Sequence, residues 1–170
     1  MDLSKLAIGK NAPEEINVVI EITQGSSIKY EMDKESGFIF VDRFSFSAFA
    51  FPFNYGFVPH TMSEDGDPVD VVLLSSYPLA PGVVIPARPV GMLEMEDEAG
   101  VDAKIIAVGT QKVDPFYVHV TDISDIEEAV KNRIKHMYEH YKDLEPGKWV
   151  KVRDFKDKVA AIAEIKKGMK

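Results

Sequence analysis

The chain has 170 residues, of which 45% are hydrophobic and 28% charged, and its formal net charge is −8 at pH 7. This length fits one domain, residues 1–170, with a real hydrophobic core. The acidic balance argues against a nucleic-acid binder, because such proteins neutralise phosphates with a basic surface. The sequence has no cysteine, which excludes disulfides, thiolate catalysis and cysteine-ligated metal centres.

Membrane insertion and secretion are also not expected. No apolar run approaches the roughly 18 residues that suggest a membrane span. The segment Met1–Leu6 lacks the long apolar core of a secretory signal. A cytoplasmic protein that does not contact a membrane is therefore the expectation.

The first two-thirds of the chain is predicted to be β-structure. Short runs of β-branched and aromatic residues alternate with turn-forming segments such as Gln24–Ser27 and Lys34–Gly37. Pro86 and Pro89 interrupt one long run and indicate an edge position or a bulge there. The predicted strands are Ile16–Thr23, Ile28–Asp33, Phe38–Arg43, Val69–Leu74, Val83–Met95 and Val101–Val108.

The last third is predicted to be mainly helical. One apolar face is marked by residues three and four positions apart, and Ser124 followed by Glu127 suggests a capping box at its start. The residues of this face are Ile126, Val130, Ile134, Met137 and Tyr141.

A short strand is expected at Lys148–Val152, followed by a final helix from Asp154 to about Lys167. Val159, Ile162 and Ile165 would face inward from that helix. Several closely spaced strands followed by helices favour an α+β fold, a compact β-barrel with the helices packed outside.

An acidic turn precedes the strand that begins near Val69. Asp65, Asp67 and Asp70 lie within six residues, and Gly66 and Pro68 between them favour a rigid turn. An Asp-rich surface turn is the simpler interpretation. However, Asp70 opens an apolar run, where an uncompensated charge is costly, and a hard divalent cation with oxygen ligands would compensate it. The later ligands of a calcium-binding helix–loop–helix are absent.

A second acidic group lies around a predicted hairpin. If residues 98–101 form a four-residue loop, Asp97 and Asp102 face each other across it, and Lys104 shares a strand face with Asp102. Opposed like charges destabilise a hairpin unless a cation lies between them. A solvated acidic hairpin is the alternative.

Basic residues are interleaved with these acids. Lys29 and Glu31 share a strand face, and Arg43 follows Asp42. A surface salt-bridge ladder would explain such pairs. Beside a carboxylate site for several metal ions, the same cations suit phosphoryl transfer, in which charge develops on phosphate oxygens.

One further motif indicates different chemistry. His136, Glu139 and His140 match the H-x-x-E-H pattern of inverted zinc peptidases, with both imidazoles on one helix face. Short matches of this kind arise often by chance, and the concentrated carboxylates lie elsewhere. A zinc peptidase is therefore the competing enzyme hypothesis, and His60 and His119 receive no role.

Taken together, these residues resemble the family I soluble inorganic pyrophosphatases, and closely the bacterial-type short form. The family signature, with three aspartates at fixed spacing, is met by Asp65–Val71. The segments that carry the resemblance are Val18–Ile22, Ile28–Gly37, Val41–Phe44, Pro52–Gly56, Asp65–Asp70, Arg88–Gly91, Asp97–Lys104 and Glu139–Glu145.

The resemblance implies Mg²⁺-dependent hydrolysis of inorganic diphosphate to two orthophosphates, with several Mg²⁺ ions per site. It also implies a five-stranded OB-like barrel with flanking C-terminal helices, and commonly a homohexamer. By this resemblance Asp65, Asp70 and Asp102 ligate the first ion, and Asp70 bridges to a second. Asp97 and Asp102, with Glu31 nearby, would hold the ions that arrive with the substrate.

The resemblance assigns the remaining roles as well. Asp67 would be the general base, and Glu21 a supporting acid behind the metal ligands. The substrate-binding residues would be Lys29, Arg43, Tyr55, Lys104, Tyr141 and Lys142, with Tyr55 and Lys104 supporting the metals and the nucleophile.

Phe51 departs from the family pattern, which commonly has Tyr there. The ring is kept and one hydroxyl is lost, so weaker phosphate binding with retained activity is expected. Two further alternatives are an OB-type oligonucleotide-binding module, which the acidic face disfavours, and a homologue that binds without turnover.

Overall fold

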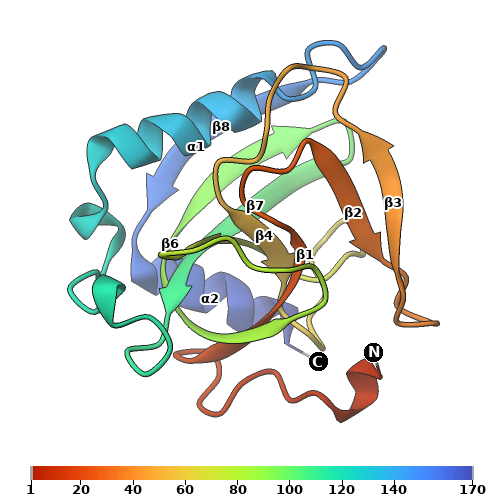
Figure 1. Cartoon of the computed structure of the whole chain (residues 1–170). Helices are drawn as coiled ribbons and strands as arrows, with labels where there is room; N and C mark the ends of the chain where they lie inside the picture. Colours follow the sequence, from red (N-terminus) through yellow and green to blue (C-terminus); the bar gives the residue numbers. More distant parts are fainter. Residues whose placement is uncertain (1, 170) are drawn as a thin grey trace.

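The structure is a computed structural model that describes residues 2–169 (Figure 1). The described residues form eight strands, three short 3-10 helices and two α-helices. Their bounds are η1 Leu3–Lys5, β1 Ile16–Ile22, β2 Ile28–Met32, β3 Ile39–Phe44, β4 Asn54–Phe57, β5 Asp70–Leu74, β6 Val84–Asp97, β7 Gly100–Gly109, η2 Pro115–Tyr117, η3 Ile123–Asp125, α1 Glu128–His140, β8 Val150–Lys156 and α2 Lys158–Gly168.

Five strands close into a ring. β1 pairs with β4, β4 with β5, β5 with β7, β7 with β6, and β6 returns to β1. β8 adds to the outer side of β6, and β2 and β3 form a separate antiparallel hairpin. The pairing of β5 with β7 is parallel. The predicted α+β, OB-like barrel is confirmed.

The apolar run of β5 is continuous because both faces of this strand are buried. Val71 and Leu73 belong to a core cluster that also contains residues of α2. Val72 and Leu74 belong to a second cluster that contains residues of α1. Alternate side chains of a strand point to opposite faces, so β5 lies between two apolar layers. Asp70 is therefore the polar end of a buried strand.

The first helix packs its predicted apolar face, but it does not begin as predicted. Ile134 and Met137 are buried in α1, and α1 packs against β8. Its N-cap is Glu127, which makes no side-chain capping bond, so the predicted Ser124–Glu127 capping box is wrong. A capping box begins two residues earlier, where Asp122 and Asp125 cap η3.

The final helix begins four residues later than predicted. β8 continues to Lys156, and Asp157 caps α2 by accepting a hydrogen bond from the Ala160 amide at 2.9 Å. The predictions of a helix from Asp154 and a strand ending at Val152 are therefore wrong. Ile165 is buried as expected, whereas Val159, on the first turn, is 74% exposed and does not face inward.

The hairpin between β6 and β7 is tighter than predicted. Asp97 pairs with Gly100, and Met95 pairs with Asp102. The loop therefore has two residues rather than four, and Asp97 does not lie opposite Asp102. The interruption by proline is confirmed as a bulge, since the β6–β7 register shifts between Pro89 and Gly91.

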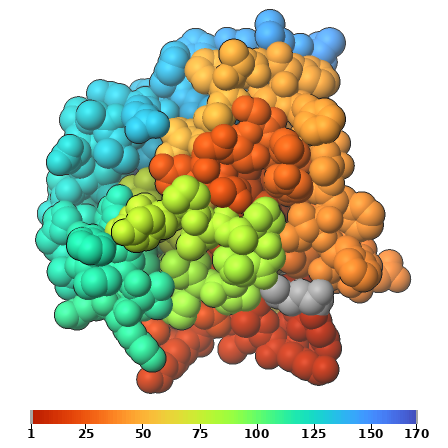
Figure 2. Space-filling view, viewed as in Figure 1, coloured from red at the N-terminus to blue at the C-terminus, as the bar shows by residue number. Residues whose placement is uncertain are grey.

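Two segments that are distant in sequence meet beside the hairpin of β2 and β3. The chain that follows β3 runs against the C-terminal end of α1 (Figures 1 and 2), where Phe49 contacts His136 with ring centroids 5.5 Å apart. Within residues 2–169, neither helix has the length and apolar character needed to cross a membrane.

Candidate active site

One cavity of about 390 Å³ collects every side chain predicted for the site. It lies between the barrel, the β2–β3 hairpin and the chain that follows α1. The predicted residues that line it are Glu21, Lys29, Glu31, Arg43, Tyr55, Asp65, Asp67, Asp70, Asp97, Asp102, Lys104, Tyr141 and Lys142.

The loop before β5 presents two aspartates in a fixed turn. Asp65 accepts a hydrogen bond from the Asp67 amide at 2.9 Å, and the Ser63 amide donates to the Asp67 carbonyl at 2.7 Å. Gly66 has φ +90°, a backbone conformation that a side chain would strain. The Asp67 side chain is exposed and lies 2.6 Å from the Lys34 ammonium. The turn thus holds both carboxylates at the cavity mouth.

A buried lysine joins the two acidic groups. Lys104 Nζ lies 2.5 Å from Asp70 and 2.7 Å from Asp102, and its side chain is 6% exposed. Burial opposes its charge, but the two carboxylates outweigh burial and raise the pKa of Lys104. Burial also raises the pKa of Asp102, and the neighbouring Asp70 adds to this. Lys104 thus stands as a buried cation between two carboxylates at the cavity floor.

A second lysine pairs with the hairpin acids. Lys142 follows α1, is buried, and lies 2.7 Å from Asp97 and 3.3 Å from Glu98. Lys148 reaches Glu98 from the next turn at 2.5 Å. Burial opposes the charge on Lys142, but its hydrogen bond to Asp97 and the nearby acids raise its pKa. The β6–β7 hairpin is thus tied to the chain after α1.

The β2–β3 hairpin contributes two cations to the cavity. Lys29 and Arg43 are paired across this hairpin. Asp42 lies between them, 3.0 Å from Lys29 and 2.6 Å from Arg43. Arg43 also contacts Glu145 at 3.2 Å, and Lys29 lies 3.5 Å from Glu31, in agreement with the predicted shared face. Both cations are thereby held toward the cavity by acids.

Glu21 is a buried acid of the site whose pKa is raised. It is 8% exposed on β1 and accepts a hydrogen bond from the Met32 amide at 2.8 Å. Burial, with Asp70 and Glu31 nearby, raises its pKa to about 7. At neutral pH this side chain therefore exchanges between its protonated and ionised forms.

Aromatic residues separate the polar cavity from the core. Tyr55 accepts a hydrogen bond from Lys104 at 3.4 Å, and burial raises the pKa values of Tyr55 and Tyr141. Phe51 is 8% exposed and borders a smaller cavity of about 60 Å³ that Tyr138 also lines. Phe51 therefore presents a ring without a hydroxyl beside Tyr55, at 6.0 Å between centroids.

Comparisons with known proteins agree with this geometry. The family model described as inorganic pyrophosphatase matches residues 18–170. The chain belongs to the inorganic pyrophosphatase family.

Similar relatives come from distant organisms. The inorganic pyrophosphatase of Aquifex pyrophilus is 57% identical over 169 residues, which cover 99% of this chain and 96% of that relative. The inorganic pyrophosphatase of Escherichia coli K12 is 54% identical over 166 residues, or 97% of this chain and 94% of the relative.

A solved structure supports the same family assignment. The inorganic pyrophosphatase structure from Thermus thermophilus has a TM-score of 0.95 and 47% identity. The comparison covers 99% of this chain and 97% of that chain. The predicted resemblance to family I pyrophosphatases is thus confirmed along nearly the whole sequence.

Some cavity residues of this pyrophosphatase-family chain were not predicted. Lys34, Glu98 and Glu145 line the cavity and pair with predicted residues, and Lys148 lines it and pairs with Glu98. Glu98 could have been predicted from the sequence, because it lies between Asp97 and Asp102 in the acidic hairpin. Lys34, Glu145 and Lys148 look like ordinary surface charges, and only the tertiary fold brings them to the site.

The residues fit hard divalent cations. Carboxylates from the loop before β5, from β2 and from the β6–β7 hairpin converge on one cavity, and Mg²⁺ takes oxygen ligands of this kind. Burial is the main reason that the pKa of Asp102 is raised, and a bound cation would favour the ionised form of this carboxylate.

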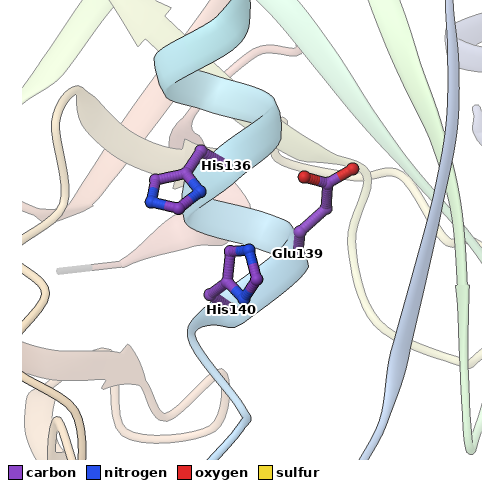
Figure 3. A group of neighbouring side chains, drawn as sticks. All are labelled: His136, Glu139 and His140. Carbon is purple, nitrogen blue, oxygen red and sulfur yellow. The ribbon is translucent and has the colours of Figure 1, made fainter.

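The H-x-x-E-H residues of this family member lie elsewhere. His136, Glu139 and His140 project from α1 and line none of the cavity described above (Figure 3). One ligand atom from each lies within 4.8 Å of the others, so this group could hold a metal ion. The family assignment takes the place of the zinc-peptidase hypothesis.

Proposed function

We propose that this chain hydrolyses inorganic diphosphate to two orthophosphates, with Mg²⁺ as its cofactor. The observation that carries the proposal is the cavity itself, in which metal-binding carboxylates face a set of lysine and arginine side chains. A small, highly charged anion needs both groups, because metal ions neutralise part of its charge and fixed cations orient it. The similar relatives are inorganic pyrophosphatases, which supports the same substrate.

Several Mg²⁺ ions are proposed to bind the carboxylates of the cavity. Bound there, the ions would supply positive charge at the phosphate oxygens and lower the pKa of an attacking water. The proposed ligands are Asp65, Asp70, Asp97, Asp102 and Glu31. Glu21 lies behind them and is proposed to support the metal ligands.

The cations of the cavity are proposed to hold the substrate. Lys29, Arg43 and Lys142 present donors from two sides of the cavity, so they can bind oxygens of both phosphoryl groups. Lys104 and Tyr55 sit at its floor and keep the carboxylates in position. Tyr141 adds a neutral donor beside Lys142. These contacts favour a transition state in which charge moves toward the leaving phosphate.

Asp67 is proposed as the general base. Its side chain is exposed to the cavity, and its partner is the half-exposed Lys34 rather than a buried group. A carboxylate in this position can accept the proton of an attacking water without first breaking a buried ion pair. Lys34 would then leave Asp67 when substrate enters.

The remaining predictions concern the whole protein. We propose that residues 1–170 form one domain and that the chain assembles as a homohexamer. Exposed phenylalanines near β3 support self-association, because monomers seldom expose a cluster of large apolar side chains. These are Phe38, Phe40, Phe44 and Phe46. A cytoplasmic location stays a prediction.

The assignment of the base is tested with Asp67→Asn. We expect turnover of diphosphate to fall by about 10²–10⁴-fold, because general-base catalysis contributes this much, while folding is kept. Orthophosphate release in saturating Mg²⁺ measures turnover, and circular dichroism measures folding. Glu64→Gln is the matched control, since Glu64 lies in the same loop but pairs with Lys167 outside the cavity. Full activity of Asp67→Asn would refute the assignment.

A further inference from the structure

A lysine at the mouth of the carboxylate cavity is paired with the side chain that is proposed as the general base. Lys34 lines the cavity, and its Nζ lies 2.6 Å from Asp67 Oδ1. We propose that Lys34 is a further substrate-binding residue, which exchanges Asp67 for an oxygen of a phosphoryl group when diphosphate enters. This role rests on the proposed hydrolysis, with Asp67 as its base.

The turn between β2 and β3 holds the backbone of Lys34 at the cavity mouth. The Asp33 amide donates a hydrogen bond to the Phe38 carbonyl at 2.9 Å, and the Ser36 amide donates to Asp33 Oδ2 at 2.8 Å. The Lys34 side chain itself is 48% exposed. Because a lysine carries its ammonium on a flexible four-carbon stem, the ammonium can change partners while the backbone stays in place.

Lys34 is held less firmly than the other cations of the cavity. Four less exposed cations each contact two acids, and these are Lys29, Arg43, Lys104 and Lys142. Within residues 2–169 the Lys34 ammonium forms an ion pair with one acid, Asp67, and both side chains of this pair are about half exposed. Water and salt screen an exposed pair, so it contributes little to stability. Lys34 can therefore leave its partner at a lower cost than the buried cations can.

The contact with Asp67 indicates which end of the substrate Lys34 reaches. A general base lies within about 2.6–3.2 Å of the water whose proton it takes, and that water lies roughly 3–3.5 Å from the atom it attacks. The Lys34 ammonium, 2.6 Å from Asp67, is therefore next to the phosphoryl group under attack. An ammonium donates charge-assisted hydrogen bonds to phosphate oxygens. One movement of Lys34 would thus bind that phosphoryl group and free the carboxylate of Asp67.

Substrate binding by Lys34 is tested with Lys34→Met and, as the matched control, Lys167→Met. Lys167 is 58% exposed and lies 2.5 Å from Glu64, in the same loop as Asp67 but outside the cavity. Orthophosphate release from diphosphate in saturating Mg²⁺ gives kcat and KM. Calorimetry in MgCl₂ gives the affinity for methylenediphosphonate, a diphosphate analogue in which a methylene group replaces the bridging oxygen.

We expect Lys34→Met to raise KM and to weaken analogue binding, each by about tenfold, because hydrogen bonds to charged groups are the stronger class. The value of kcat should stay within about twofold of the wild type, as it does when an interaction shared by substrate and transition state is removed. Lys34→Arg keeps the charge and should restore most of the affinity. Lys167→Met should behave as the wild type in both measurements.

Two results would overturn the role of Lys34 while leaving the proposed hydrolysis in place. A loss of kcat in Lys34→Met with unchanged KM and analogue affinity would show that the lysine only orients Asp67. Constants equal to those of the wild type would show that Lys34 does not contact the substrate. A wild type that neither releases orthophosphate nor binds the analogue would instead overturn the proposed function, and the role of Lys34 with it.

Discussion

Lys104 lies directly opposite Asp70 in the parallel β5–β7 pair, and its ammonium is 2.5 Å from the Asp70 carboxylate. The same ammonium is 2.7 Å from Asp102, two residues back along β7. One buried cation thus joins the two acidic segments of the sequence. This register places an aspartate at the polar end of a buried strand, where the proposed Mg²⁺ ions would bind.

Replacing Lys104 with Met should therefore be strongly destabilising without divalent ions. The change leaves two partly buried carboxylates without their cation, and breaking a buried pair costs about 3–5 kcal/mol. We expect a drop of about 3 kcal/mol in the free energy of unfolding in EDTA, measured by urea denaturation. Added Mg²⁺ should recover part of this loss, because the ions replace the missing positive charge.

Lys34→Met is the matched control for that experiment. Its pair with Asp67 is equally short, at 2.6 Å, but both side chains are about half exposed, at 48% and 58%. Exposed ion pairs contribute about 0–1 kcal/mol, so stability should change by less than about 1 kcal/mol. Equal losses in both variants would contradict the role of burial at Lys104.

Glu21 should make stability fall as the pH rises toward neutrality. Its pKa is about 7 in the folded protein, against an ordinary value of 4.5, so only the folded state keeps the proton between these values. The free energy of unfolding then decreases with rising pH across this window, by about 3 kcal/mol in total. In Glu21→Gln this decrease should be absent, and the variant should exceed the wild type in stability at pH 8. Thermal unfolding of both proteins in EDTA, from pH 4.5 to pH 8, measures this pH dependence of stability.

Glu14→Gln controls for the removal of a charge alone. Glu14 is exposed, and its substitution should leave the pH dependence as in the wild type. If Glu21→Gln and the wild type show the same slope between pH 4.5 and 7, Glu21 does not titrate in this range.

Tyr138→Phe should stabilise the protein. Among the described residues the Tyr138 hydroxyl is buried without a hydrogen-bond partner, while its ring stacks on Phe53 at 5.7 Å. An unpaired buried hydroxyl costs about 1–3 kcal/mol, and Phe keeps the ring contacts. A gain of about 1 kcal/mol in the free energy of unfolding is expected. A loss of that size would show that the hydroxyl has a partner in solution.

Local patterns in the sequence predict most of the fold. β-branched runs predict β1, β5 and β7, and the apolar face of α1 follows from its three- and four-residue spacing. β4 was not predicted, because four residues that include Gly56 give little alternation. The tight β6–β7 hairpin was misjudged because Glu98 is not a residue that usually marks a two-residue turn.

Local patterns predict only part of the candidate site, and the family resemblance supplies the roles of the other residues. Asp70 and Asp97 end buried strands, where a carboxylate stands out. Lys34 and Lys148 could not be found in this way. Each is an exposed lysine, and the acid with which it pairs lies far away in the sequence. Pairing across the tertiary fold leaves no local pattern.

The central claim is tested most directly by measuring orthophosphate release from inorganic diphosphate by the purified chain in MgCl₂ and in excess EDTA. The account predicts rapid release that requires Mg²⁺ and is lost on chelation, with ATP under the same conditions separating diphosphate hydrolysis from general phosphoanhydride hydrolysis. Absence of Mg²⁺-dependent release from diphosphate by the folded protein would contradict it.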